Sequence, residues 1–140
     1  MAEPRYIVDA GPIVAALNRR DEHHAWAKAV FDSLGAPPIT CEAVLTEVCW
    51  HLRDSPEAVA RVLEMPSRGD LLLFPVADAE GVALAGLVRK YGKRMDLADA
   101  SLVRLAEIFP KAKVITTDLE DFRVYRRNRN EPILLIHPDR

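Results

Sequence analysis

Short apolar runs of strand length alternate along this chain with longer segments that have the apolar spacing of helices. Strands are expected at Arg5–Asp9, near Ile39, and over Leu71–Phe74, Lys113–Thr116 and Pro132–Ile136. Helices are expected over Pro12–Arg19, Glu22–Leu34, Cys41–Arg53, Ser55–Met65, Asp78–Tyr91 and Asp96–Phe109. Strands that alternate with helices predict a three-layer α/β/α fold, in which helices cover both faces of a mostly parallel central sheet.

Proline and capping residues set the predicted ends of several helices. Ser55–Pro56 is typical of an N-cap followed by a first helical position, and Pro66 is expected to stop that helix. Asp78 and Asp96 are expected to cap two later helices. Leu71–Phe74 is apolar throughout, which predicts a strand that is buried on both faces.

The size and composition predict one globular domain over residues 1–140. Hydrophobic residues make up 49% of the chain and charged residues 29%, which argues against disorder. The net charge of −2 means that any contact with a nucleic acid must come from a local basic patch. No apolar run approaches the ~20 residues of a membrane span, and the N-terminus lacks the pattern of a secretory signal.

The two cysteines are expected to be reduced. Cys41 and Cys49 fall within one predicted helix. A rise of 1.5 Å per residue places their Cα atoms roughly 12 Å apart, which is beyond the reach of a disulfide. Reduced cysteines are typical of a cytoplasmic protein, and this location is our expectation.

Four acidic residues in separate motifs stand at the ends of predicted elements or beside apolar helix faces. They are Asp9 in YIVDAGP, Glu47 in VLTEVCW, Asp99 in MDLADASLV and Asp118 in VITTDLEDF. Asp9 and Asp118 follow predicted strands, and ligands of parallel sheets bind beyond the carboxyl ends of the strands. Acids next to hydrophobic surface need a cation or a proton to accompany them.

Each of these acids also has a purely structural interpretation. Asp9 can form a turn, and Asp118 can cap the short turn that follows it. Asp99 heads an apolar helix stripe, but an acid in a first turn capped by Asp96 can equally serve the helix dipole. Glu47 can be an exposed helical residue. A structural role for all four at once is less expected than for any one alone.

Bringing such acids together has an electrostatic consequence. Two carboxylates 4 Å apart repel by roughly 4 kcal/mol at an effective dielectric of 20. A group of four therefore requires bound cations, raised pKa values or intervening water. Oxygen ligands favour Mg²⁺ or Mn²⁺. Zinc is not expected, because no Cys or His cluster has ligand spacing around His23, His24, His51 or His137.

The ordered motifs resemble the PIN-domain family of metal-dependent ribonucleases over nearly the whole chain. VDAGPIVAALNRRDEHH resembles the family's opening, TEVCW its helical glutamate, DLADASLVRLAE its third-acid helix and ITTDLEDFRVYR its closing turn. In size the chain is similar to the VapC-type toxins of bacterial toxin–antitoxin pairs. The resemblance implies a PIN-like fold and an endoribonuclease that hydrolyses RNA phosphodiester bonds. It also implies a cognate antitoxin and a homodimer.

The resemblance implies a set of site residues as well. The quartet that would hold Mg²⁺ or Mn²⁺ consists of Asp9, Glu47, Asp99 and Asp118. The Thr116 hydroxyl would stand beside it, and Asp121 is the alternative to Asp118 as the fourth acid. Glu47 or Asp118 would instead orient the attacking water. The alternative function is a non-catalytic PIN-like module that binds RNA or a protein and uses the acids only structurally.

Two basic segments are candidates for holding RNA phosphates beside these acids. Lys90–Arg94 precedes the third acidic motif, and Arg123–Arg129 follows the last one and carries four arginines. A solvated charged surface explains each segment equally well. Trp26, Trp50 and Tyr125 are candidates for stacking on bases, although the two tryptophans are expected to be packing residues.

Overall fold

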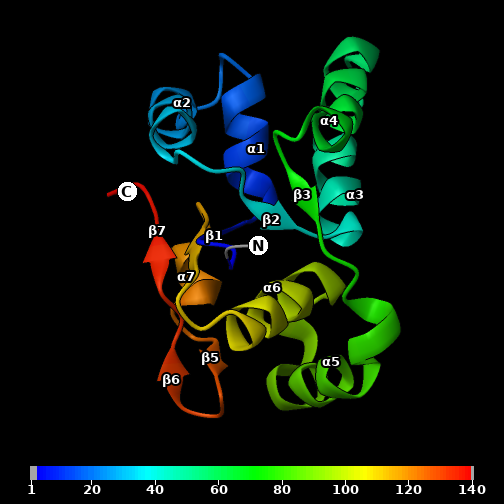
Figure 1. Cartoon of the computed structure of the whole chain (residues 1–140), viewed down its shortest axis with the longest axis vertical. Coiled ribbons are helices and arrows are strands. Elements are labelled where there is room, and N and C mark those ends of the chain that lie inside the picture. Colours follow the sequence, from blue (N-terminus) through cyan, green and yellow to red (C-terminus); the bar gives the residue numbers. More distant parts are fainter. Residues whose placement is uncertain (1–2, 140) are drawn as a thin grey trace.

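The computed structural model describes residues 3–139 and contains a five-stranded parallel sheet with the order β3-β2-β1-β4-β7 (Figure 1). Its strands are β1 (Tyr6–Val8), β2 (Ile39–Thr40), β3 (Leu72–Leu73), β4 (Lys113–Ile115) and β7 (Leu135–Ile136). Two further strands, β5 (Arg126–Arg127) and β6 (Glu131–Pro132), form an antiparallel hairpin. The predicted α/β fold with a central parallel sheet is confirmed.

Helices flank this sheet, as the alternation along the chain predicts. They are α1 (Ala10–Leu17), α2 (His24–Ser33), α3 (Glu42–His51), α4 (Pro56–Arg68), α5 (Ala77–Tyr91), α6 (Leu97–Ile108) and α7 (Leu119–Phe122), with a 3-10 turn η1 (Gly92–Arg94). In Figure 1, α1 to α4 occupy the upper half of the view, and α5 and α6 the lower half. The sheet separates these two groups.

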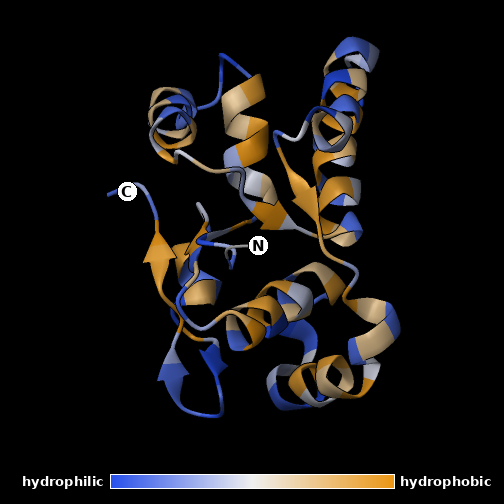
Figure 2. Cartoon of the chain, in the orientation of Figure 1, coloured by the Kyte–Doolittle hydropathy of each residue, from blue (hydrophilic) through white to orange (hydrophobic). Residues whose placement is uncertain are grey.

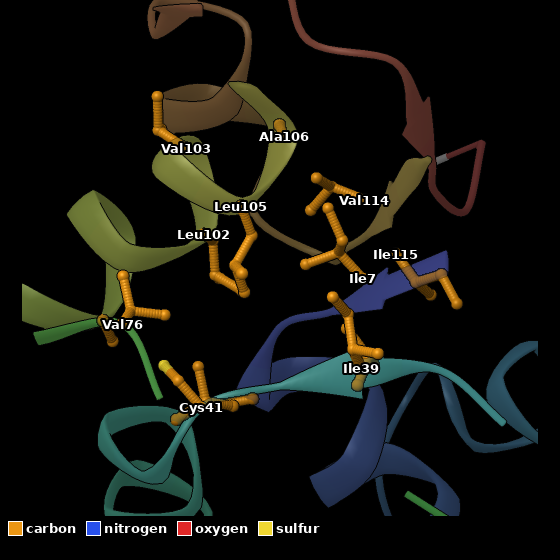
Figure 3. Close-up of a cluster of buried hydrophobic side chains, with 14 of the residues drawn as sticks. Ile7, Ile39, Cys41, Val76, Leu102, Val103, Leu105, Ala106, Val114 and Ile115 are labelled. Carbon is orange, nitrogen blue, oxygen red and sulfur yellow. The ribbon is translucent and has the colours of Figure 1, made fainter. Parts of the chain in front are cut away.

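One part of the core lies between α6 and the sheet (Figure 3). Leu102 and Leu105 of α6 are fully buried, and so are Ile7 of β1 and Val114 of β4. Burying an aliphatic side chain of this size stabilises the fold by about 1.5–3 kcal/mol. Because α6 contacts β1, β4 and α3, this packing fixes the helix that carries Asp99 relative to the strands that precede the other acids.

Two predicted helix ends are wrong, and the Ser55 cap is confirmed. The helix α4 continues through Pro66 and ends at Gly69, whose φ of 78° favours glycine. A proline in the last turn removes only one backbone hydrogen bond, so it need not stop the helix. The helix α5 begins at Ala77, so Asp78 lies inside the first turn, where its charge still suits the helix dipole.

Two strand predictions also need correction. Leu72 and Leu73 are 45% and 39% exposed, because β3 is an edge strand with a neighbour on one side only; Leu71, before it, is fully buried. The predicted strand Pro132–Ile136 is divided between β6 of the hairpin and β7 of the sheet. The β5–β6 hairpin was not predicted, because its strands are charged and lack the apolar alternation that marks a strand.

The remaining predictions about the whole chain can be compared directly with the structure. Cys41 and Cys49 are both free, as expected. Among residues 3–139, none of the helices combines the length and the apolar character that crossing a membrane requires.

Candidate functional site

Asp9 lies at the junction between the central strand β1 and helix α1. It is the N-cap of α1, with its Oδ1 accepting a hydrogen bond from the Ala10 backbone N–H at 2.8 Å. Its Oδ2 accepts a second bond from the Thr116 hydroxyl at 2.7 Å. Only 7% of Asp9 is exposed. Burial raises the pKa of Asp9, and the charges of Asp118 and Asp96 raise it further, against the lowering effect of the two hydrogen bonds.

Thr116 connects Asp9 to the segment that follows the neighbouring strand β4. Its side chain is buried, and its Oγ1 also accepts a hydrogen bond from the Asp118 backbone N–H at 2.9 Å. Asp118 is the N-cap of α7, as predicted, and accepts from the Asp121 N–H at 3.0 Å. One buried hydroxyl therefore fixes the ends of two adjacent parallel strands and the acids that follow them.

Asp99 lies in the first turn of α6, behind the Asp96 cap. Asp96 is the N-cap, and its Oδ1 accepts from the Asp99 backbone N–H at 2.8 Å. The Asp99 side chain is not needed for capping, and its Oδ2 instead lies 2.7 Å from the Tyr125 hydroxyl. Burial raises the pKa of Asp99 to about 7, with further contributions from Asp96, Asp9 and Asp118.

Glu47 lies on α3 and is half-buried, so it is not the exposed helical residue of the structural interpretation. Burial raises the pKa of Glu47 to about 7, followed by the negative charges of Asp96, Asp9 and Asp99. These causes place Glu47 within electrostatic reach of acids on α1 and α6. Helix α3 contacts both of these helices.

The four predicted acids thus share one region, but they do not converge on one point. Each of Asp9, Glu47 and Asp99 has its pKa raised by other acids of the set. Within residues 3–139, however, no three Asp, Glu, His or Cys side chains lie close enough to hold an ion directly.

Asp118 and Asp121, the two candidates for the fourth acid, have different surroundings. The charge of Asp118 contributes to the raised pKa of both Asp9 and Asp99. Asp121 lies 3.5 Å from the Arg94 guanidinium.

Of the three aromatic residues that were candidates for stacking on bases, Trp26 packs as predicted, and Tyr125 and Trp50 do not match their predictions. Tyr125 is fully buried and contacts Asp99 through its hydroxyl, so it cannot stack on a base. Trp50 is 62% exposed, with the Arg53 guanidinium 3.8 Å above its ring, and is not the packing residue that was expected. Trp26 packs against the core, as predicted. Sequence reasoning missed the role of Tyr125, because no local pattern places it beside an acid 26 positions earlier.

A polar cavity of about 590 Å³ opens beside the acidic region. Gly11, next to the cap of α1, and Thr117, between Thr116 and Asp118, line it together with His23 and His51. A Cβ atom at position 11 would overlap the Thr117 hydroxyl oxygen, so a larger residue there would require the Thr117 side chain to move. A larger cavity, of about 610 Å³, lies between α1, α2 and the end of α4, away from the acids.

Comparisons with solved structures identify similar folds. The toxin VapC20 of Mycobacterium tuberculosis, described as cleaving the sarcin–ricin loop, superposes with a TM-score of 0.68 at 23% identity, covering 78% of this chain and 86% of its own. VapBC2 from Rickettsia felis, bound to a DNA fragment from its promoter, gives a TM-score of 0.60 at 16% identity, with 96% and 98% covered. None of the curated protein sequences compared with this chain matches it significantly.

A family comparison covers most of the chain. The PIN domain matches residues 6–128, which include all four acids, Thr116 and Tyr125. The order of the acidic motifs, the parallel sheet and the two structural likenesses agree with this match. This chain therefore belongs to the PIN domain family.

Proposed function

We propose that this protein is a metal-dependent endoribonuclease that hydrolyses RNA phosphodiester bonds. The observation that carries the proposal is that acids from separate elements raise one another's pKa, two of them to about 7. The residues that would hold the metal are Asp9, Glu47, Asp99 and Asp118. Carboxylates are retained in such an unfavourable arrangement where a cation compensates their charge.

The donor atoms suit a hard divalent cation. All four proposed ligands are carboxylates, which select Mg²⁺ or Mn²⁺ over zinc. When bound, such an ion supplies Lewis acidity: it activates a water molecule and compensates charge on the attacked phosphate. Among residues 3–139 no three acids lie close enough to hold an ion directly, and an ion that keeps several water ligands does not require that they do.

The chain's own residues would position these carboxylates. Thr116 holds Asp9 Oδ2 and the Asp118 backbone, and the Tyr125 hydroxyl holds Asp99 Oδ2. Residues that form hydrogen bonds with metal ligands orient those ligands, and they are commonly needed for full affinity for the metal. Among residues 3–139, Glu47 has no hydroxyl partner like Thr116 or Tyr125, and its side-chain hydrogen bond is with Asp96. Besides being a proposed metal ligand, Glu47 is therefore the candidate for orienting the attacking water.

The toxin assignment forms part of this proposal. VapC20, a toxin that cleaves the sarcin–ricin loop, and VapBC2 are similar in fold to this chain. We therefore include a toxin role and a cognate antitoxin in the proposed function; the homodimer stays an expectation from the family resemblance. The exposed Trp50, Leu97 and Val82 provide apolar surface that a second copy or an antitoxin would cover.

Cleavage of RNA by the purified protein tests the proposal. Wild type, Asp99→Asn and the remote surface variant Asp70→Asn would be incubated with total cellular RNA and ribosomal RNA in Mg²⁺, Mn²⁺ or chelator. We expect wild type and Asp70→Asn to cut only with metal, and Asp99→Asn to lose at least a hundredfold in rate. Absence of cutting together with absence of metal binding would leave the non-catalytic binding module as the function.

A further inference from the structure

The two basic segments that flank the acidic motifs in the sequence lie together in the fold. The Lys90 ammonium donates a hydrogen bond to the Arg129 carbonyl at 2.8 Å. The Tyr91 hydroxyl accepts from the Arg126 backbone N–H at 2.7 Å. These contacts fasten the end of α5 and the turn η1 to the β5–β6 hairpin. We call the resulting surface the basic arm; its residues are Lys90, Lys93, Arg94, Arg126 and Arg129.

The basic arm is connected to the acidic region through a single buried side chain. The Tyr125 hydroxyl oxygen lies 2.7 Å from Asp99 Oδ2 and 3.0 Å from the Arg94 carbonyl oxygen. The Tyr125 ring also packs edge to face on Tyr91, with centroids 5.1 Å apart. Four extended residues span at most about 14 Å, so the hairpin tip at Arg129 lies within that distance of Tyr125.

Most of the positive charge on the basic arm is not neutralised by acids. Arg94 contacts Asp121, but Lys90, Lys93, Arg126 and Arg129 form no ion pair among residues 3–139. Figure 2 shows the hairpin as a hydrophilic projection beside apolar β7. The acidic region repels a phosphate backbone, so a nearby surface of opposite charge is what a bound RNA strand would need.

Arg127, between two of these residues, has a different role. It is 7% exposed, and its guanidinium donates to the carbonyl groups of Ala106 and Pro110 at the end of α6. Arg127 therefore anchors the hairpin to α6 and does not contribute to the exposed charge. The anchored hairpin can present Arg129 from a fixed position, whereas the Arg126 guanidinium is half-buried and donates to the Arg123 and Tyr125 carbonyl groups.

Two residues at the hairpin tip, Asn128 and Arg129, have an unfavourable backbone conformation. Asn128 and Arg129 have φ angles of 47° and 76°, in the left-handed region. Asparagine tolerates this region, but arginine does so at a cost that glycine or asparagine would avoid. This exposed arginine in an unfavourable backbone conformation is therefore a candidate for a functional side chain.

We propose that the basic arm binds the phosphate backbone of the RNA strand next to the cleavage site, with Arg129 as a phosphate contact at the hairpin tip. The proposal rests on the proposed ribonuclease function, since it assigns a surface to the same substrate. Arginine at the tip and lysines on α5 and η1 contact phosphates without reading bases, so this surface gives affinity and register but no sequence preference. Tyr125 keeps the basic arm in a fixed position relative to Asp99.

RNA binding in chelator separates this proposal from the catalytic one. Binding of a short, fluorescein-labelled, single-stranded RNA of mixed sequence would be measured by anisotropy over a range of salt concentrations. The proteins are wild type, Arg129→Asn, Arg129→Lys and the matched control Arg68→Asn on α4. Arg68 lies on the exposed part of α4 and its removal changes the net charge by the same amount.

We expect Arg129→Asn to weaken binding about fivefold and to lower the slope of log Kd against log salt by about 0.7, the value for one lost phosphate contact on a single strand. Arg129→Lys should keep the slope, and Arg68→Asn should match wild type. The melting temperature of Arg129→Asn should be unchanged or higher, because asparagine relieves the backbone strain. Binding lost together with folding would therefore contradict the assignment.

Other outcomes also decide between the two proposals. Wild-type protein that binds RNA through Arg129 but cuts none supports the basic arm and contradicts the ribonuclease. Protein that cuts RNA while Arg129→Asn binds and cuts like wild type overturns the basic arm alone. Failure of wild type to bind the RNA at low salt also overturns it, and an acidic protein segment would then be the better partner for this surface.

Discussion

Replacing Asp99 by asparagine should stabilise the metal-free protein above neutral pH, although it removes a proposed metal ligand. Burial and neighbouring acids raise the pKa of Asp99 from 3.8 to about 7. A shift of roughly three units corresponds to about 4 kcal/mol, and half-burial of the side chain reduces this to about 2 kcal/mol. Asparagine keeps an oxygen that accepts from Tyr125 and adds N–H donors that face the neighbouring acids.

The gain should depend on pH in a defined direction. Because the folded-state pKa of Asp99 is the higher one, the folded protein binds this proton more tightly than the unfolded chain does. The wild type is therefore stabilised at low pH and loses that stability as the pH rises from about 4 to about 7. The advantage of Asp99→Asn should be about 2 kcal/mol at pH 8 and should fall to about 1 kcal/mol or less at pH 4.5.

Urea denaturation in chelator at these two pH values measures the effect. Asp70→Asn serves as the control for removing an exposed acid, and it should behave like wild type at both. The reasoning would be refuted if Asp99→Asn were less stable than wild type at pH 8, or if its stability difference were the same at both pH values. Either result would mean that Asp99 is not under electrostatic strain in the folded protein.

Three further substitutions test the supports of the site. Thr116→Val should reduce the free energy of unfolding by about 1–3 kcal/mol and the rate of RNA cleavage at least tenfold, because Asp9 and the Asp118 N–H lose a shared partner. Thr116→Ser should retain both the stability in urea denaturation and the rate in the cleavage assay. Gly11→Ala should lower stability by about 1–3 kcal/mol through overlap with Thr117, and adding Thr117→Ala should restore the midpoint of denaturation. Arg127→Met should cost about 2–3 kcal/mol, seen as a lower urea midpoint, because two carbonyl groups at the end of α6 lose their donor; an unchanged midpoint would show that the hairpin needs no anchor.

The parts of the fold that depend on local patterns were predictable. The cap Asp96, the apolar stripe behind Asp99 and the short turn after Asp118 are set by residues within one or two helical turns of each other. The same local rules place Asp9 at the end of a strand. Because parallel strands end at one edge of a sheet, the approach of Asp9 and Asp118 followed from the pattern as well.

The parts that depend on contacts between distant segments were not predictable. Nothing near Leu72 in the sequence shows that its strand lies at the edge of the sheet, since strand order depends on packing elsewhere. The β5–β6 hairpin is held by Arg127, which donates to a carbonyl group near the end of α6, and by the Tyr91 hydroxyl of α5. These contacts are made with distant segments, so the charged strands give no local signal. Tyr125 became part of the site for the same reason, through a contact with Asp99.

Titration calorimetry of the protein with Mn²⁺ at pH 7, in two buffers of different ionisation enthalpy, would show whether these carboxylates bind a metal ion. We predict saturable binding that releases about one proton, because Asp99 and Glu47 have pKa values of about 7 and must both ionise. We also predict that Asp99→Asn binds at least tenfold more weakly and releases fewer protons. Absence of Mn²⁺ binding at millimolar concentration, or equal binding by Asp99→Asn, would contradict the claim that these carboxylates form a metal site.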